Sequence, residues 1–324
     1  MNSKILGTGS YLPKNIVTNH DLERRLDTSH DWIVQRTGIH QRHIADQKES
    51  VAFMATKAAE AALKAANLTK EQLDQIGLII VASCSGESVF PSAAGGVQKN
   101  LLLPECPAFD LSAACAGFIY ALSVADAFIK TNQAKYALVI GSEVMSRVFN
   151  PDDRSIAVLF GDGAGAVLLG QSTEPGIIAT KIHADGNYDK MLSLGHFYAR
   201  DRETSDLSPY YIHMDGKEVF KIAVTKLEEM VENIVVENGF KKSDLNWLVP
   251  HQANYRIIKS VAKRLDLPEE QVILTVAKHA NTSAASIPLA LDCGVRDQRV
   301  KPGDLILLES FGGGLAWGSA LIRY

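Results

Sequence analysis

Short apolar runs alternate along the chain with longer segments whose apolar residues recur at helical spacing. Ile76–Ala82 and Tyr136–Ile140 are almost wholly apolar over the length of a strand, which predicts buried strands. Ser50–Asn67 and Ser112–Lys130 are rich in alanine and predict helices. This alternation predicts an α/β fold with a mostly parallel sheet that is covered on both faces.

Three pairs of segments resemble each other in the same order along the chain. The pairs are Leu73–Ser83 with Leu245–His251, Tyr136–Glu143 with Asp304–Ser310, and Phe160–Leu169 with Phe311–Ile322. One interpretation is that all buried strands look alike. The other is two similar α/β halves, an N-terminal half at residues 1–171 and a C-terminal half at 172–324, each of the size of a domain. An active site is then expected at the strand ends where the halves meet.

The charge balance narrows the function classes. The 324 residues carry 33 Lys and Arg against 37 Asp and Glu, a formal net charge of −4, which argues against a nucleic-acid-binding chain. The N-terminus has no signal-peptide pattern, and the longest apolar runs are far shorter than the ~20 residues of a membrane helix. We therefore expect a cytoplasmic protein without a membrane partner. The four cysteines are too few for a disulfide scaffold and lack metal-ligand spacing, so no metal is expected.

Cys115 is the candidate nucleophile. It follows a predicted strand at Cys106–Leu111 and lies near the first turn of the helix predicted at Ser112–Lys130. The free N–H groups at a helix start favour the thiolate, which is the reactive form of cysteine. A small buried hydrophobic residue is the other interpretation, and we keep it for Cys84, Cys106 and Cys293.

Two polar residues after predicted strands are candidate partners of Cys115. His251 follows a strand that ends at Pro250, and Asn281 lies in the loop after a strand predicted at Val272–Val276. Cysteine, histidine and asparagine side chains can together activate a thiol or stabilise an oxyanion. The structural alternative for Asn281 is helix capping.

Two glycine-rich segments let the backbone approach a ligand closely. Phe311–Ser319 contains three consecutive glycines, whose N–H groups could form an oxyanion hole. Neither this segment nor Gly161–Ala166 has the G-x-G-x-x-G spacing of a dinucleotide site.

Seven short motifs run in order through nearly the whole chain. They are Trp32–Gly38, Phe90–Ala94, Asp110–Leu122, Phe160–Gly165, His251–Asn254, Asn281–Ser286 and Phe311–Ser319. Together they resemble the β-ketoacyl-[acyl-carrier-protein] synthase III family, the initiating condensing enzymes of type II fatty-acid synthesis within the thiolase superfamily. The resemblance implies a thiolase-like five-layer αβαβα fold built from two similar halves, a homodimer, and an active site at the end of a narrow tunnel.

The resemblance also implies a reaction and its residues. Cys115 would take the acyl group of an acyl-CoA, most simply acetyl-CoA, while the N–H groups of Cys115 and Gly313 hold the oxyanion. His251 and Asn281 would then stabilise the enolate formed when malonyl-acyl-carrier protein loses CO2, and the product is a 3-oxoacyl carrier protein. Decarboxylation supplies the carbanion, so no cofactor is expected. His279 is off-register from the third catalytic position and is expected to be structural.

Further positions match binding residues of the family. The nucleotide of CoA would contact Thr28, Trp32, Arg36 and Arg154, with the adenine between Trp32 and Arg154, and Ser155 replaces a glycine found in a well-studied type. Tunnel-wall positions, for which core packing is the alternative, are Met214, Gly216, Phe220, Ala253 and Asn254. Phe90 matches a residue inserted across the dimer interface at the end of the acyl pocket.

The helix after His251 carries a candidate docking surface for the acidic acyl carrier protein. Arg256, Lys259 and Lys263 share one face of it, opposite an apolar face. An ordinary solvated face is the alternative.

Other functions are weighed against the initiating synthase. The first is a related Cys-His-Asn condensing enzyme of secondary metabolism, of the alkylquinolone or polyketide type. A catalytically silent carrier-protein-binding subunit would have lost the nucleophile, and a thioester hydrolase would need a base aimed at water.

Overall fold

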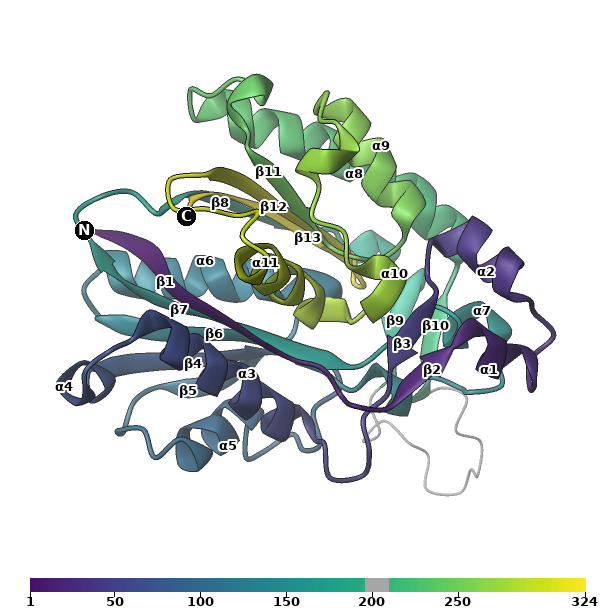
Figure 1. Ribbon diagram of the computed structural model, residues 1–324, viewed down its shortest axis with the longest axis horizontal. Helices are drawn as coiled ribbons and strands as arrows, with labels where there is room; N and C mark the ends of the chain where they lie inside the picture. The colour runs from purple at the N-terminus through teal and green to yellow at the C-terminus, as the bar shows by residue number, and fades with distance from the viewer. Residues whose placement is uncertain (196–209) are drawn as a thin grey trace.

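The computed structural model describes residues 1–195 and 210–324, which form two large sheets (Figure 1). The five-stranded sheet has the order β1 (Asn2–Tyr11), β7 (Gly163–Ser172), β6 (Tyr136–Glu143), β4 (Ile76–Ala82) and β5 (Ala108–Leu111). The four-stranded sheet has the order β11 (Trp247–Pro250), β12 (Leu305–Gly312), β13 (Ala316–Arg323) and β8 (Ile177–Ala184).

Helices cover both faces of each sheet. α6 (Gly117–Lys130) and α11 (Ser286–Arg296) lie between the sheets, while α3 (Val51–Ala66) and α5 (Ala93–Asn100) cover the outer face of the first (Figure 1). α8 (Gly216–Glu237) covers the outer face of the second sheet, with α9 (Tyr255–Arg264) packed beside it. Three apolar clusters fill the spaces between these layers. The expected five-layer αβαβα architecture is therefore present.

The remaining elements are short. They are β2 (Ile16–Thr18), α1 (Asn19–Glu23), α2 (His30–Thr37), β3 (Gln41–His43), α4 (Lys70–Leu73), α7 (Arg154–Ala157), β9 (Leu192–Leu194), β10 (Ile212–Met214) and α10 (Val276–His279). Across the two described stretches of chain, no helix is both long and apolar enough to cross a membrane.

The segments that resemble each other in sequence occupy matching places. They contain β4 and β11, β6 and β12, and β7 and β13, and the spatial orders β7-β6-β4 and β13-β12-β11 agree. β4 pairs with β6, and β11 with β12, in parallel, whereas β6 pairs with β7, and β12 with β13, antiparallel. The fold is thus built from two similar halves. The boundary between residues 171 and 172, at the end of β7, stays a prediction.

The sheets are mixed, so the expectation of a mostly parallel sheet is wrong. Three of the seven strand pairs in the two large sheets are parallel and four are antiparallel. β12 and β13 are separated only by residues 313–315, which is too short for the crossover that a parallel pair requires.

The strand predicted at Val272–Val276 is also wrong. This segment makes one isolated bridge, between Leu248 and Val272, and its last residue begins α10. The Gln252 side-chain oxygen accepts from the backbone N–H groups of Thr275 at 2.8 Å and Val276 at 3.0 Å. Because a side chain takes these donors, they do not extend a strand ladder.

Local sequence explains how the predicted helices begin and end. The Ser50 hydroxyl accepts from Phe53 N at 3.1 Å, and Asn67 adopts a left-handed φ of 51°, so both ends of α3 are capped. The helix predicted at Ser112–Lys130 begins as a 3₁₀ turn, Ala114–Ala116, and continues as α6. Cys115 is therefore held in the turn that starts α6.

Candidate active site

One cavity of about 1140 Å³ contains the three predicted catalytic residues. Cys115 reaches it from the start of α6, His251 from the end of β11, and Asn281 from the loop after α10. Their exposed fractions are 9%, 6% and 7%, so each side chain is buried in the body of the protein while bordering the cavity. The structure thus brings together residues that lie 166 positions apart in sequence.

The end of β12 holds Cys115 in place. The Ser310 hydroxyl donates to the Cys115 carbonyl oxygen at 2.7 Å. A Cβ at Gly312 would lie 2.6 Å from the Cys115 backbone nitrogen, so glycine is what allows this close approach. Gly313 borders the cavity, and within the described chain no backbone carbonyl accepts from its N–H.

Burial has the largest influence on the pKa of the Cys115 thiol. Burial raises the pKa of Cys115 to about 12; a hydrogen bond with Ser283 lowers it, and the Glu143 carboxylate adds to the rise. Burial of the thiol therefore opposes the thiolate form that the start of the helix was expected to favour.

His251 is a neutral hydrogen-bond donor. Burial lowers the pKa of His251 to about 3. Its Nδ1 lies 2.6 Å from the Ser286 hydroxyl, which also accepts from Gln252 N at 3.3 Å. We infer that Ser286 donates its hydrogen to Nδ1, which leaves the imidazole proton on Nε2.

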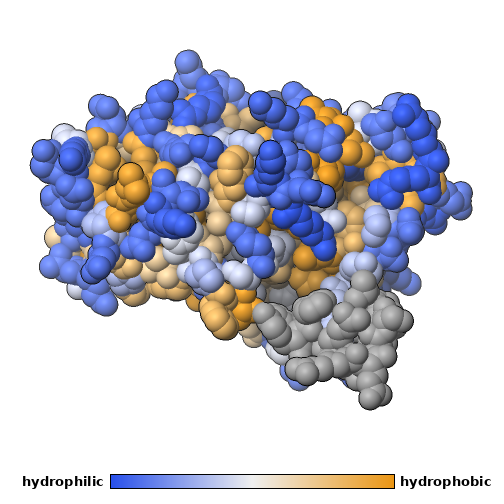
Figure 2. All heavy atoms as spheres, turned by 90° about the horizontal axis from the view of Figure 1, so that it is seen from below, coloured by the Kyte–Doolittle hydropathy of each residue, from blue (hydrophilic) through white to orange (hydrophobic). Residues whose placement is uncertain are grey.

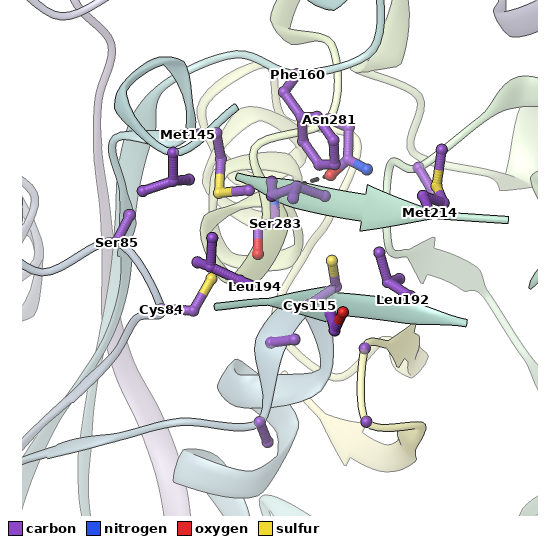
Figure 3. A pocket seen from close by; sticks show the side chains of 18 of the residues that line it. Cys84, Ser85, Cys115, Met145, Phe160, Leu192, Leu194, Met214, Asn281 and Ser283 are labelled. Atoms are coloured by element: carbon purple, nitrogen blue, oxygen red, sulfur yellow. Dashed lines mark hydrogen bonds between the residues drawn. The ribbon is translucent and has the colours of Figure 1, made fainter. Parts of the chain in front are cut away.

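Asn281 is fixed through its backbone and its side-chain oxygen. Its N–H donates to Leu159 O at 2.9 Å and its carbonyl accepts from Gly161 N at 3.0 Å, which gives the Phe160–Gly165 motif a structural role. Its Oδ1 accepts from Ser283 N at 2.9 Å (Figure 3). The amide nitrogen therefore remains to donate into the cavity. His279 does not border the described cavity.

Gln252 positions both His251 and the segment before Asn281, and sequence reasoning missed it. Its amide nitrogen donates to Pro250 O at 2.8 Å and Ile273 O at 3.0 Å, while its oxygen accepts the two donors described above. It is fully buried. The feature of the sequence that could have indicated Gln252 is an uncharged polar residue directly after a histidine at the end of a strand.

Cys84 also borders the cavity, although the sequence offered no reason to single it out. It follows β4, and its thiol donates to Glu143 at 3.3 Å. Figure 3 shows Cys84 on the same side of the cavity as Met145 and Leu194. β4 and β5 pair in parallel, so their carboxyl ends meet, and this tertiary pairing brings Cys84 near the start of α6.

The predicted tunnel residues border the same cavity as the catalytic residues. They are Met214, Gly216, Phe220, Ala253 and Asn254. The Asn254 side chain also caps α9 by accepting from Arg256 N at 2.8 Å and donates to Arg36 O at 3.1 Å. Arg36 is thereby placed beside a residue that lines the cavity.

The predicted nucleotide-binding residues lie outside the cavity lining but near one another. The Arg154 guanidinium is 5.2 Å from the centre of the Trp32 ring, and the Arg36 guanidinium is 5.9 Å from it. An adenine between Trp32 and Arg154 would therefore displace Arg154. The Thr28 hydroxyl is buried without a hydrogen-bond partner among residues 1–195 and 210–324. The Ser155 hydroxyl donates to Asp153 at 2.6 Å.

The predicted docking residues are exposed on α9. Arg256, Lys259 and Lys263 face solvent, while Ile258 and Val261 are buried, as the helical pattern predicts. The Arg256 guanidinium lies 5.2 Å from the centre of the Phe220 ring. Because Phe220 lines the cavity, the basic face begins at the cavity wall.

Phe90 lies apart from the cavity of its own chain. Its side chain is 84% exposed, and it is not among the described lining residues. As for metals, the described residues contain no group of three or more His, Cys, Asp or Glu side chains placed to hold an ion.

Glu309 makes protein stability depend on pH. It lines the cavity from β12, burial raises its pKa to about 8, and its Oε2 has no hydrogen-bond partner in the described chain. Between the unfolded pKa of about 4.3 and this value, the folded state holds a proton that the unfolded state has lost, so stability falls as pH rises. Glutamine cannot titrate in this range. We therefore expect the free energy of unfolding of Glu309→Gln to fall by up to about 1.4 kcal/mol less per pH unit than that of the wild type. Denaturant unfolding at pH 5 and pH 8 measures it, and equal pH slopes in both proteins would contradict it.

Comparison with known proteins identifies the family. A model described as 3-oxoacyl-[acyl-carrier-protein (ACP)] synthase III matches residues 109–186, and the model of its C-terminal part matches residues 235–324. The chain is 53% identical over 324 residues to the β-ketoacyl-[acyl-carrier-protein] synthase III of Salmonella arizonae, covering 100% of both chains. The chain belongs to the 3-oxoacyl-[acyl-carrier-protein] synthase III family.

Solved structures agree with this assignment. The synthase III of Aquifex aeolicus VF5 has a TM-score of 0.92 and 47% identity, with 99% of this chain and 100% of that chain covered. The priming β-ketosynthase of the R1128 polyketide pathway has a TM-score of 0.93 at 35% identity, covering 99% and 96%. The fold is thus thiolase-like. The chain is an acyltransferase that carries out the initiating condensation of fatty-acid synthesis, and the higher identity to synthase III proteins does not favour the secondary-metabolism alternative.

Proposed function

We propose that Cys115, His251 and Asn281 catalyse the decarboxylative condensation of an acyl-CoA, with acetyl-CoA as the starter, and malonyl-acyl-carrier protein. One observation carries the assignment: a thiol, a neutral imidazole and an amide nitrogen border the same cavity. These three groups correspond to a nucleophile and two hydrogen-bond donors, which is what the two half-reactions need.

In the first half-reaction the Cys115 sulfur attacks the thioester carbonyl of acyl-CoA. The thiol proton leaves with the departing CoA sulfur, so the step neither gains nor loses a proton. The N–H groups of Cys115 and Gly313 hold the oxyanion of the tetrahedral intermediate. Removing one such donor typically raises the barrier by about 2.7–4 kcal/mol.

In the second half-reaction malonyl-acyl-carrier protein loses CO2. His251 Nε2 and the Asn281 amide nitrogen donate to the thioester oxygen, where negative charge develops. The enolate carbon attacks the acyl group, and the Cys115 thiolate leaves and takes up one proton. Because the lost carboxylate supplies the carbanion, the proposed chemistry uses no metal or redox cofactor.

Binding of CoA involves a nucleotide site and a tunnel. Trp32 and Arg154 take the adenine, Thr28 and Arg36 contact the rest of the nucleotide, and the tunnel residues surround the pantetheine arm. The proximity of Arg36 to Asn254 supports a continuous path from the nucleotide site to the cavity.

The basic face of α9 binds acyl carrier protein in this proposal. Charge reversal at Lys259 and Lys263 is expected to raise KM for malonyl-acyl-carrier protein about tenfold, because it replaces attraction by repulsion at the protein–protein contact. Acylation by acetyl-CoA should be unchanged. Steady-state kinetics at low salt measure the effect, with Lys70→Glu on the distant α4 as control. Equal KM values in the two variants would contradict the docking site.

We also propose that the protein is a homodimer and acts in the cytoplasm. Phe90 would reach the acyl pocket of the partner. Its 84% exposure, the exposure of Val89 and Leu102, and the position of β5 at the edge of its sheet support an interface there. Figure 2 shows apolar groups among polar ones on the face seen from below.

The test of the proposed function uses the intact protein with an equimolar mixture of acetyl-, isobutyryl- and octanoyl-CoA, followed by malonyl-acyl-carrier protein. We expect an acetyl adduct on the protein by mass, and then 3-oxobutyryl-acyl-carrier protein. A branched or longer adduct would contradict the acetyl starter. Turnover with malonyl-CoA in place of the carrier-bound substrate, or no adduct at all, would contradict the condensation proposed.

A further inference from the structure

Arg42 carries a fully buried guanidinium that the reaction described above does not use. It lies in β3, where it pairs with Val17 of β2, and it is 1% exposed. Burial lowers the pKa of Arg42 to about 10, and the positive charge of Arg25 adds to this effect, so the group is still a cation at physiological pH. Because removing a cation from water is costly, the groups that it binds indicate its role.

Arg42 binds uncharged oxygen atoms on two other segments of the chain. Its Nη1 donates to the Asn19 side-chain oxygen at 2.9 Å and to Val17 O at 3.3 Å, and its Nη2 donates to Val158 O at 2.8 Å. Val158 directly follows α7, and the last backbone carbonyls of a helix have no partner within the helix. The rigid fork of the guanidinium therefore joins β2 and the start of α1 to the end of α7.

The segment at residues 158–161 in turn holds Asn281. The N–H of Asn281 donates to Leu159 O at 2.9 Å, and its carbonyl accepts from Gly161 N at 3.0 Å. Phe160 and Asn281 form a parallel bridge, and Figure 3 shows the two side chains next to each other at the cavity. Because both backbone groups of Asn281 are bonded to this one segment, a displacement of the segment displaces Asn281.

β3 also contacts this segment closely through its backbone. His43 O accepts from Asp162 N at 2.9 Å. A Cβ at Gly161 would lie 2.7 Å from His279 O and 3.1 Å from the Arg42 Cβ, so three segments meet here with little free space. Tightly packed interiors transmit a displacement instead of absorbing it. A change at Arg42 is therefore expected to reach the segment that binds Asn281.

We propose that Arg42 is a positioning residue for Asn281: it holds the Val158 carbonyl and thereby fixes the segment to which both backbone groups of Asn281 are bonded. The Asn281 amide nitrogen then meets the thioester oxygen correctly in the second half-reaction. A misplacement of about 1 Å can cost about 10²-fold in rate. Cys115 is held from β12 by Ser310, so the first half-reaction should not depend on Arg42.

Decarboxylation by Arg42→Gln, measured as CO2 release from malonyl-acyl-carrier protein per acetylated protein, tests the proposal. The glutamine amide cannot span the acceptors on both sides, so the rate should fall about tenfold or more. The loss should appear in kcat and not in KM, because the Asn281 amide acts where charge develops. Acylation of Cys115 by acetyl-CoA, followed by intact mass, should stay within about twofold of the wild-type rate, because Asn281 acts only in the second half-reaction.

A double-mutant cycle with Asn281→Ala separates positioning from a general loss of structure. If Arg42 acts through Asn281, then Arg42→Gln should lower the residual decarboxylation of Asn281→Ala by less than about twofold. An equal loss in both backgrounds would overturn the proposal, since the loss would then come from the charge of Arg42 or from the fold. Acylation that falls as far as decarboxylation, or an unchanged decarboxylation rate in Arg42→Gln, would overturn it too.

Two further variants complete the experiment. Arg323→Gln also removes a guanidinium that donates to a backbone carbonyl at 2.8 Å, but Arg323 is not among the described residues that line the cavity, so both half-reactions should be unchanged. Arg42→Lys keeps the charge without the fork and should lower decarboxylation about threefold. If Arg42→Gln does not fold, the cycle with Arg42→Lys decides. A loss that Asn281→Ala abolishes supports the proposal, and no loss or an equal loss overturns it.

The inference rests on the proposed function, in which Asn281 donates to the enolate oxygen. If Asn281→Ala itself keeps the wild-type decarboxylation rate, the proposed function is wrong at this residue. If Asn281→Ala loses decarboxylation while Arg42→Gln retains it, the role of Arg42 alone is rejected.

Discussion

Cys115→Ser is expected to abolish formation of the acyl-enzyme. Serine matches cysteine in shape, so the fold should survive, but its hydroxyl is a much weaker acid and a poorer nucleophile in the same desolvated turn. We expect acylation by acetyl-CoA to fall by at least about 10³-fold, because removal of the nucleophile from another enzyme lowers kcat by about 10⁶-fold. Intact mass after incubation with the acyl donor, with peptide mapping of the adduct, measures it.

The matched control for Cys115→Ser is Cys106→Ser. Cys106 precedes β5 and is not among the described residues that line the cavity, so its variant should be acylated at the wild-type rate. Thermal unfolding should confirm that both variants are folded. Normal acylation of Cys115→Ser, or an adduct that maps to Cys84 in the wild type, would show that Cys115 is not the nucleophile.

His251→Ala and Asn281→Ala are expected to separate the two half-reactions. Both variants keep Cys115 and the glycine backbone, so they should still be acylated. Each loses one donor to the thioester oxygen, and decarboxylation of malonyl-acyl-carrier protein should fall about 10²–10³-fold. Release of CO2 measures it. Retention of the wild-type rate in both variants would remove the enolate-stabilising role.

The pH dependence adds an independent check on His251. With a pKa of about 3, the ring is neutral throughout the physiological range and becomes charged only as the pH falls below about 4. We expect the decarboxylation rate of the wild type to show no inflection near pH 6.5, where an ordinary histidine titrates. His279→Gln, two residues before Asn281 and outside the described cavity lining, is the control and should retain decarboxylation. An inflection near pH 6.5 that disappears in His251→Ala would contradict a neutral His251.

Sequence motifs were sufficient to select three candidate catalytic residues that border one cavity. Cys115, His251 and Asn281 each follow a predicted strand or begin a helix, and the fold places all three on one cavity. The repeated order of apolar segments predicted two similar halves, because strands that are buried in the same order must be covered by neighbouring layers in the same way. Local periodicity likewise predicted the apolar and basic faces of α9.

Only the tertiary structure decided the electrostatics of the site and its supporting residues. Burial depends on every layer packed around a side chain, so the sequence could not show that desolvation raises the pKa of Cys115 and lowers the pKa of His251. Gln252 is held by hydrogen bonds to residues of another segment, Ile273 and Thr275. By itself the sequence determined which residues have reactive side chains and which elements carry them. The packing of two sheets decided how far each is removed from water and which neighbour takes its hydrogen, because desolvation and hydrogen bonding are set by contacts between elements rather than within them.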